Sequence, residues 1–414
     1  MLPGLCTFGA ISSRLGRPLS EPLFNFMANQ SRNSMTQSTC NVITGTGSYI
    51  PPGKVRNEDF LEHTFVDPEG KKLAKANREI IDKFLEITTI GERRYVADDL
   101  KTSDIAFRAA EAALEAAGTD REALDYIIVA HNFGDVTSRG GHSDMVPSLA
   151  ARVKHKLGIK NPDTVAYDMI FGCPGWLESL IQAHYYLSSG DAKRALVIGA
   201  DTLSRISDPH DRDSLIYSDG AGAVILEAKL CEKPQGVLAH KTRSDTLTHS
   251  GMLYMGPSYQ CGGKDSGKDS DKDSSKDGGK DVSKEGEALY LKMHGRKLYQ
   301  YALETVPGAI RACLEKSGVA IDEVKKILIH QANGKMDDAI LERLYESYGM
   351  DTPPEGVMPM TISWLGNSSV ATIPTLLDLL LKGHLEFHEL NAGDVVIFAS
   401  VGAGMNVNAM VYRM

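Results

Sequence analysis

A repeated pattern, with copies 200 residues apart, constrains the fold of this chain more than any other feature. The segment RAAEAALEAAGTDREALDYIIVAHN aligns without a gap with GAIRACLEKSGVAIDEVKKILIHQA. Each copy has the spacing of an amphipathic helix that ends at a glycine, Gly118 or Gly318. A short acidic turn and a compact apolar strand follow, at 125–130 and at 325–330. The chain is therefore predicted to contain two copies of one α/β unit.

Two further pairs of segments support the duplication. Gly172-Cys173 aligns with Gly366-Asn367, 194 positions later, and each pair precedes a very apolar segment. In the same way, SDGAGAVILEA aligns with SVGAGMNVNAMVYRM near the C-terminus. All three matches occur in the same order along the chain, which is the order expected of a duplicated unit.

The three matches predict two halves, roughly 41–228 and 229–414, packed about a pseudo-twofold axis. Helical segments as apolar as 176–187 and 370–381 must be buried on most of their faces. The expected fold class is α/β with the layers α-β-α-β-α, in which two mixed sheets enclose the buried helices. This arrangement brings the N-termini of the two buried helices near one another.

Two segments differ in composition from the rest of the chain. Residues 1–40 hold six serines, three arginines, one acid and no lysine, and we interpret them as a disordered N-terminal extension. A targeting segment and a misassigned start are the alternatives. Residues 264–284 repeat lysine every four positions among Gly, Ser and Asp, which predicts a flexible, low-complexity surface loop in the second half.

The charge and cysteine content argue against several classes of protein. With 45 Lys and Arg against 54 Asp and Glu, the net charge of -9 disfavours a nucleic-acid or anionic-membrane binder. No apolar run approaches the roughly 18 residues that a membrane-spanning helix needs. The six cysteines form no CxxC pair and no close cluster. We therefore expect a reducing compartment, the cytoplasm, and neither a zinc site nor a disulfide framework.

Cys173 occupies a position that favours nucleophilic chemistry. It follows the apolar segment TVAYDMIFG and precedes Pro174, a residue favoured at the first position of a helix. The end of a helix has free N–H groups and a partial positive charge, and both stabilise a thiolate. A buried cysteine is usually only a small apolar side chain. Its position at an elbow, rather than on a helix face, favours a nucleophile.

His330 and Asn367 are the partners that the duplication suggests for Cys173. His330 ends a strand at the register where the first copy has Ala130, so one copy places an ionisable group where the other has a methyl. Asn367 is the counterpart of Cys173 itself. A structural histidine and an asparagine N-cap are the ordinary alternatives. If the two helix ends meet, sulfur, imidazole and carboxamide share one pocket.

Other motifs carry less weight. Cysteine, histidine and asparagine in this order also occur in papain-like proteases, so a cysteine-dependent thioester or amide hydrolase is the alternative function. GTGSYIPPG departs from a dinucleotide-binding fingerprint because Ile50 replaces the third glycine. In DPHDRD (208–213), a solvated loop explains the acidic residues as well as a metal site does. We predict neither a metal nor a cofactor.

Taken together, these segments resemble β-ketoacyl-acyl-carrier-protein synthase III, a condensing enzyme of the thiolase superfamily. The resemblance runs from about Val42 to Met414 and rests on ITGTGSYIP, the cysteine elbow, DPxDR, SDGAGA, LKMHGRKLY, HQAN, GNSS and the terminal Gly-rich strand. It implies a thiolase-like fold and a homodimer. It also implies an acyltransferase that condenses an acyl primer with malonyl-acyl-carrier protein to give a 3-oxoacyl product, initiating fatty-acid or related lipid or polyketide synthesis.

The resemblance also implies roles for individual residues. Cys173 matches the nucleophile that accepts the acyl group from acyl-CoA or a similar thioester. His330 and Asn367 match the pair that polarises the malonyl thioester carbonyl. The backbone N–H groups of Cys173 and Ala403 match an oxyanion hole, whose donors stabilise developing negative charge. No bound cofactor is implied.

Substrate contacts follow from the same resemblance. Arg212 matches an arginine that contacts CoA, Arg296 lies where the pantetheine tunnel would open, and Lys335 matches a basic position used for the acidic carrier. The usual WxxxRTGI clamp for the CoA adenine is replaced by DKFLEITTIGERR (82–94). Met145 stands in an acyl-gating segment contributed across the dimer interface, where an aromatic residue is common. A flexible methionine could admit a primer other than acetyl, and the primer, the donor and the pathway stay open at this point.

Overall fold

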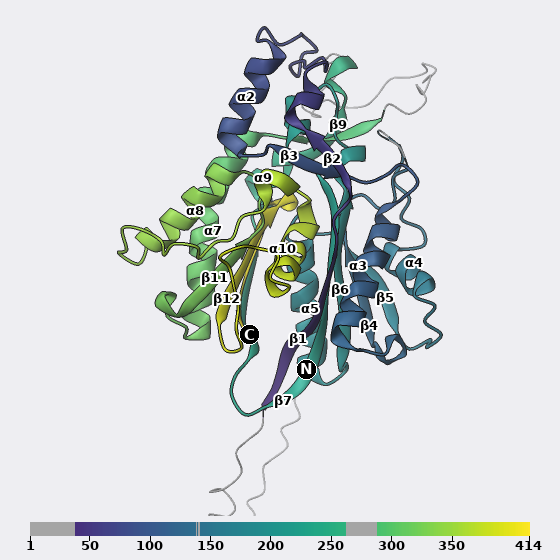
Figure 1. The fold of residues 1–414 in the computed structure, drawn as a ribbon, viewed down its shortest axis with the longest axis vertical. Helices are drawn as coiled ribbons and strands as arrows, with labels where there is room; N and C mark the ends of the chain where they lie inside the picture. The colour runs from purple at the N-terminus through teal and green to yellow at the C-terminus, as the bar shows by residue number, and fades with distance from the viewer. Residues whose placement is uncertain (1–37, 138, 140, 262–287) are drawn as a thin grey trace, which may run out of the picture.

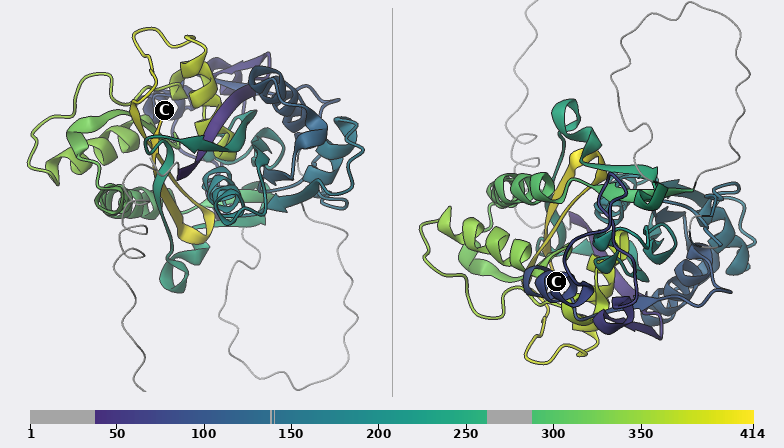
Figure 2. Two further views of the ribbon diagram at one scale, coloured as in Figure 1. Left: turned by 90° about the horizontal axis from the view of Figure 1, so that it is seen from below. Right: turned by 90° about the horizontal axis from the view of Figure 1, so that it is seen from above.

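Two β-sheets, with helices between them and outside them, form five layers (Figure 1). The computed structural model describes residues 38–137, 139, 141–261 and 288–414. Seen along two further directions, the same stack of sheets and helices is visible end-on (Figure 2). The predicted α-β-α-β-α order is confirmed.

The first sheet is mixed and has the strand order β1-β7-β6-β4-β5. β4 runs parallel to β5 and β6, whereas β7 runs antiparallel to β1 and β6. Helices α3 and α4 pack on its outer face through alanine, valine and leucine side chains. The bounds are β1 (Ser38–Tyr49), β4 (Tyr126–Ala130), β5 (Val165–Met169), β6 (Arg194–Thr202), β7 (Asp219–Cys231), α3 (Thr102–Ala117) and α4 (Leu149–Lys156).

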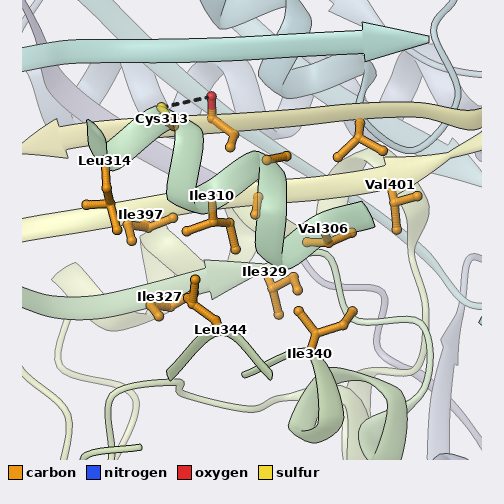
Figure 3. Packing of buried hydrophobic residues seen from close by; sticks show 14 of the residues in the cluster. Val306, Ile310, Cys313, Leu314, Ile327, Ile329, Ile340, Leu344, Ile397 and Val401 are labelled. Atoms are coloured by element: carbon orange, nitrogen blue, oxygen red, sulfur yellow. Dashed lines mark hydrogen bonds between the residues drawn. The ribbon is translucent and has the colours of Figure 1, made fainter. Parts of the chain in front are cut away.

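The second sheet has the order β11-β12-β13-β8 and is covered on its outer face by α7 and α8. Its core is apolar, and Ile310 of α7, Ile340 of α8 and Ile397 of β12 belong to one cluster of buried side chains (Figure 3). The Cys313 thiol points to the sheet and donates to the carbonyl of Ala409 over 3.5 Å. The bounds are β8 (Gly236–Ser244), β11 (Val324–Ile329), β12 (Val395–Gly402), β13 (Asn406–Arg413), α7 (Gly295–Ser317) and α8 (Gly334–Glu346).

Helices α5 (Gly175–Ser189) and α10 (Thr372–Leu381) form the middle layer. Every residue of α10 except Leu381 is buried, as expected for a helix enclosed by two sheets. The one buried acid in α10, Asp378, accepts hydrogen bonds from Thr46 and Ser48 of β1. These bonds satisfy the carboxylate where burial would otherwise be costly.

Smaller elements gather at one end of the sheets, where the cavity described below opens (Figure 1). Two antiparallel strand pairs, β2–β3 and β9–β10, and helix α2 lie there. The predicted loop 264–284 falls between β9 and β10 and lies outside the described residues. The bounds are β2 (Gly53–Arg56), β3 (Glu92–Tyr95), β9 (Leu253–Pro257), β10 (Leu289–Met293), α2 (Asn77–Thr88), α6 (Thr246–His249) and α9 (Ile362–Leu365).

The repeated segments fold as the sequence predicts. α3 and α7 end at Gly118 and Gly318, whose φ angles of 60° and 71° lie in the left-handed region that glycine adopts without strain. β4 and β11 follow within one residue of the predicted positions. The predicted N-terminal extension, residues 1–40, lies outside the described residues except for 38–40, which pair with β7 as the start of β1. The division of the chain near residue 228 stays a prediction.

Among the described helices, none is both long and apolar enough to cross a membrane.

Asp337 in α8 is the least expected feature of the second core. Its side chain is fully buried, and neither carboxylate oxygen has a hydrogen-bond partner. Burial, with the charge of Asp338 as a smaller cause, raises the pKa of Asp337 well above its usual value. The folded protein therefore favours the protonated form of this carboxyl up to a higher pH than the unfolded chain does.

We predict that Asp337→Leu stabilises the protein, and increasingly so as the pH rises. The unfolded chain releases this proton near its ordinary pKa of about 4, so the penalty is absent below that pH and grows by up to about 1.4 kcal/mol per pH unit above it. Urea unfolding at about pH 5 and about pH 8 measures the change in the free energy of unfolding. Glu342→Leu, on the exposed face of the same helix, is the control. An equal gain in the free energy of unfolding for Asp337→Leu at both pH values would contradict the raised pKa of Asp337.

Candidate active site

One cavity of about 370 Å³ is lined by residues of both halves, including residues that the sequence singled out. Cys173 comes from the first half, whereas His330, Asn367 and Ala403 come from the second. Arg296 also lines this cavity. The structure therefore brings together all four residues predicted for the chemistry and one of the four predicted to bind substrate.

Most of the remaining lining is apolar. Phe84 and Ile87 of α2 belong to the stretch that replaces the expected adenine clamp, and here they form part of the cavity wall. The β9–β10 strand pair and α7 contribute four further residues to the cavity lining, Leu253, Leu291, Met293 and Leu298. A cavity of this volume with few polar groups suits an extended acyl or pantetheine chain.

Cys173 stands at a sharp turn between β5 and α5. Gly172 has a φ angle of 69°, which turns the chain out of the strand segment, and α5 then starts at Gly175. The sequence placed Cys173 at or just before the first helical position. The structure places it two residues before that position, because Pro174 occupies the cap.

Burial decides the protonation of the Cys173 thiol. It raises the pKa of Cys173 to about 11, against the lowering effect of a hydrogen bond from the Ser369 hydroxyl, while the charge of Asp201 raises it further. The sequence led us to expect a thiolate stabilised by the end of α5. The loss of hydration is instead the largest effect, and the thiol is protonated at neutral pH in the free protein.

His330 follows the last residue of β11 and is nearly fully buried. Its backbone N–H donates to the carbonyl of Ala399 over 2.8 Å, which fixes the residue at the end of the sheet. Burial lowers the pKa of His330 to about 4, with the backbone of Ser369 acting in the opposite direction. The imidazole is therefore neutral at pH 7. Its counterpart Ala130 packs in the apolar middle layer.

Asn367 follows Gly366, whose φ angle of 66° makes the second elbow. Two backbone hydrogen bonds, to Ile216 at 3.0 Å and from Ser218 at 2.8 Å, tie Asn367 to the first half. Its Oδ1 accepts the backbone N–H of Ser369 over 2.8 Å, so the amide nitrogen is the end left to donate. Asn367 does not cap α10, because that helix starts five residues later.

Two glycines allow the Ala403 turn to touch the cysteine elbow. A Cβ atom on Gly402 would lie 2.5 Å from the backbone nitrogen of Cys173. A Cβ atom on Gly172 would lie 2.7 Å from the backbone nitrogen of Ala403. A side chain at either position would push the two turns apart. The two backbone nitrogens are thus held beside each other at the cavity, as an oxyanion hole requires.

Asn406 braces both turns, and no sequence pattern indicated this role. Its Nδ2 donates to the carbonyl of Ala403 over 3.0 Å and to that of Phe171 over 3.3 Å. Its Oδ1 accepts the hydroxyl of Ser244. Asn406 begins an ordinary strand, so no local pattern marks it.

Three of the predicted substrate residues lie outside the cavity lining. The side chains of Arg212 and Lys335 are 60% and 52% exposed, and Lys335 lies 3.6 Å from Glu86. Met145 is 47% exposed on the surface of this chain. Any role of these residues in binding therefore concerns the surface around the cavity or a partner, not its interior.

The DPHDRD segment differs from the expected solvated loop. Asp208 and Asp211 are buried, and the buried Lys292 of β10 lies 2.6 Å and 3.2 Å from their carboxylates. This cluster holds β10 against the cavity, where Leu291 and Met293 form the wall. Across the described ranges, no three potential ligand side chains are placed to hold a metal ion. The sequence could not reveal the cluster because Lys292 is distant along the chain.

We predict that Gly402→Ala disables the site without removing any functional side chain. The added methyl would collide with the Cys173 backbone, and a displacement of about 1 Å costs on the order of 100-fold in rate. Gly308→Ala is the matched control, because nothing lies within 4 Å of a Cβ there. Acylation of Cys173 by acyl-CoA, followed by mass spectrometry, measures the effect. A folded Gly402→Ala protein with unchanged acylation would refute the proposed contact.

The comparisons with known proteins agree with this geometry. Two family profiles match, 3-oxoacyl-[acyl-carrier-protein (ACP)] synthase III at residues 167–246 and its C-terminal domain at residues 314–414. The chain is 33% identical over 374 residues to beta-ketoacyl-[acyl-carrier-protein] synthase III of Rhodobacter capsulatus, which covers 90% of this chain and 98% of that protein.

Solved structures give the same result. The crystal structure of 3-oxoacyl-[acyl-carrier-protein] synthase III from Aquifex aeolicus VF5 superposes with a TM-score of 0.69 at 27% identity, covering 90% of this chain and 100% of that one. The corresponding synthase from Thermus thermophilus gives a TM-score of 0.70 at 28% identity, covering 90% and 99%. The hydrolase alternative is not favoured. The chain belongs to the 3-oxoacyl-[acyl-carrier-protein] synthase III family, condensing acyltransferases with a thiolase-like fold.

Proposed function

We propose that Cys173 carries the acyl primer and that His330 and Asn367 drive the decarboxylation of malonyl-acyl-carrier protein. The observation that carries this assignment is the shared cavity, which these three residues line from two copies of one fold unit. Neither copy holds all three groups. The site therefore depends on the packing of the halves against each other.

In the first step, the sulfur of Cys173 attacks the carbonyl of the primer thioester. The bond from the acyl carbon to the donor sulfur breaks, a bond to Cys173 forms, and the thiol proton ends on the departing CoA or carrier thiol. The backbone N–H groups of Cys173 and Ala403 stabilise the oxyanion formed on the way. Because the thiol of the free protein is protonated, this proton has to move as the attack occurs.

In the second step, malonyl-acyl-carrier protein occupies the cavity and loses carbon dioxide. The electron pair of the broken carbon–carbon bond forms an enolate on the thioester, and His330 and the Asn367 amide donate to its oxygen. A neutral imidazole suits this donor role. The enolate carbon then attacks the acyl group, Cys173 leaves as a thiolate, and a 3-oxoacyl-carrier product forms.

The surrounding charges support roles in holding both thioesters. Arg296 in the first turn of α7 lines the cavity and would contact the pantetheine arm or its phosphate. Arg212 and Lys335 are exposed cations that would meet CoA phosphates and the acidic carrier. Four cysteines are free thiols, which supports the cytoplasm as the compartment; they are Cys40, Cys173, Cys231 and Cys313.

A homodimer is part of this proposal. Among the described strands β5 pairs only with β4, so no described strand covers its other edge. Val165 and Ile170 at the two ends of this strand are 46% and 56% exposed. An open strand edge with apolar neighbours is suited to pairing with a second copy of this chain. Met145 would then reach the partner's acyl pocket.

We predict that incubation with acyl-CoA adds one acyl mass to the protein and that Cys173→Ala abolishes this adduct. Malonyl-carrier protein should then release carbon dioxide and extend the chain only in the protein that carries the adduct. Intact-protein mass spectrometry with a panel of primers measures the first step and labelled carbon dioxide the second. Cys313→Ala, which removes a buried thiol outside the cavity, is the control. An acyl adduct that persists in Cys173→Ala would contradict the assignment.

A further inference from the structure

A chain of hydrogen bonds runs from Asp201 through Asn132 and Ser369 to the Cys173 sulfur. The Ser369 hydroxyl lies 3.4 Å from Cys173 Sγ, and Asn132 Nδ2 lies 3.0 Å from that hydroxyl. The same Nδ2 lies 2.7 Å from a carboxylate oxygen of Asp201. None of these three residues, Ser369, Asn132 and Asp201, has a role in the two steps described above.

Ser369 links two groups of the site. It has a φ angle of 54°, in the left-handed region that serine adopts at a cost, and it is nearly fully buried. Its backbone N–H donates to Asn367 Oδ1, and its hydroxyl lies against Cys173. The strained backbone thus allows one residue to orient the amide and to contact the sulfur.

The amide of Asn132 decides which way the Ser369 hydroxyl points. Asp201 accepts the backbone N–H of Asn132 over 2.9 Å and its side-chain NH₂ over 2.7 Å, which fixes the nitrogen of the amide towards Asp201. An amide nitrogen donates and does not accept, so the Ser369 oxygen must be the acceptor at Asn132. The Ser369 hydroxyl can then donate its proton to the Cys173 sulfur.

Without Asn132, a stronger acceptor would compete for this proton. Burial raises the pKa of Asp201 to about 6, and a hydrogen bond from the Ser369 hydroxyl is among the smaller effects that oppose this shift. A carboxylate accepts hydrogen bonds better than a thiol does. Asn132 donates two hydrogen bonds to Asp201 and so partly satisfies this competing acceptor. It therefore directs the proton away from Asp201.

The chain also crosses between the two halves. Asn132 follows β4 and Asp201 lies on β6, both strands of the first sheet, whereas Ser369 begins the short 3-10 helix Ser369–Ala371 after the second elbow. This short helix reaches the first sheet because Gly199 of β6 has no side chain; a Cβ there would collide with the carbonyl of Val370. The packing of the halves fixes the direction of the hydrogen bonds.

We propose that Asn132, held by Asp201, is a positioning residue that directs the Ser369 hydroxyl proton to the sulfur of Cys173. This bond stabilises the Cys173 thiolate that is released when the bond between its sulfur and the acyl carbon breaks. The inference rests on the proposed role of Cys173 as the acyl carrier. Its test reads the thiol directly and needs no acyl substrate, so a failure of condensation would not be mistaken for a failure of this proposal.

The experiment measures the rate at which iodoacetamide alkylates Cys173 between about pH 6 and pH 9, resolved by peptide mass spectrometry. Loss of one hydrogen bond to a thiolate raises the thiol pKa by about one unit, so Ser369→Ala should slow alkylation about tenfold at each pH. Asn132→Ala should slow it several-fold in the same way. The double variant should be no slower than Ser369→Ala alone, because Asn132 acts only through the hydroxyl.

Ser368→Ala is the matched control, since its hydroxyl faces Thr372 Oγ1 at 3.4 Å rather than the sulfur. Thermal unfolding verifies that each variant is folded. If Asn132→Ala does not fold, Asn132→Thr tests the same point. The threonine hydroxyl has one proton, so it can donate to Asp201 or to Ser369 but not to both. The proposal is overturned if alkylation of the folded Asn132 variant stays within about twofold of wild type. It is also overturned if the double variant shows the product of the two single effects.

Discussion

The contact between two backbone turns, Gly402-Ala403 and Gly172-Cys173, is the constraint on which the site depends. No side chain fits between them, so the two halves can approach closely only where both have glycine. The middle layer of α5 and α10 keeps them in this position, because nearly all of α10 and most of α5 are buried. Burial of apolar surface thus holds the two halves together. The glycines let the two turns approach closely enough for their backbone N–H groups to act together.

Burial also sets the charge of the site before substrate arrives. It raises the pKa of the Cys173 thiol to about 11 and lowers that of His330 to about 4. Thiol and imidazole are therefore both neutral at pH 7. Negative charge appears only when a thioester reacts, on an oxyanion, an enolate or a departing thiolate. Donors that are already oriented stabilise such charge without the reorganisation that water would require.

The sequence predicted the features that the duplication repeats. The paired helix ends, the two elbows and the five layers follow from apolar spacing and glycine positions in each copy. The contrast between His330 and Ala130 identified an ionisable group by comparing the copies. The same alignment contains the reverse contrast, Asn132 opposite Ala332, and this signal could have been recognised. It was missed because the first copy was expected to supply only the cysteine.

Other features depend on contacts between distant segments, which no local pattern reveals. The DPHDRD segment has the composition of a solvated loop, yet Lys292 converts it into a buried ion-pair cluster. The expectation of a thiolate at Cys173 considered the helix end alone. The loss of hydration depends on every segment that encloses the cavity, and it has the largest effect on the pKa.

We propose that the first copy supplies the thiol that accepts the acyl group, whereas the second copy supplies the side chains that drive decarboxylation. The most direct measurement compares the two partial reactions in His330→Ala and in Asn367→Ala. We expect each variant to form the acyl adduct on Cys173 at close to the wild-type rate, while carbon dioxide release from malonyl-carrier protein falls by about 100-fold or more. Carbon dioxide release at the wild-type rate in both variants, or an equal loss in both partial reactions, would contradict this division.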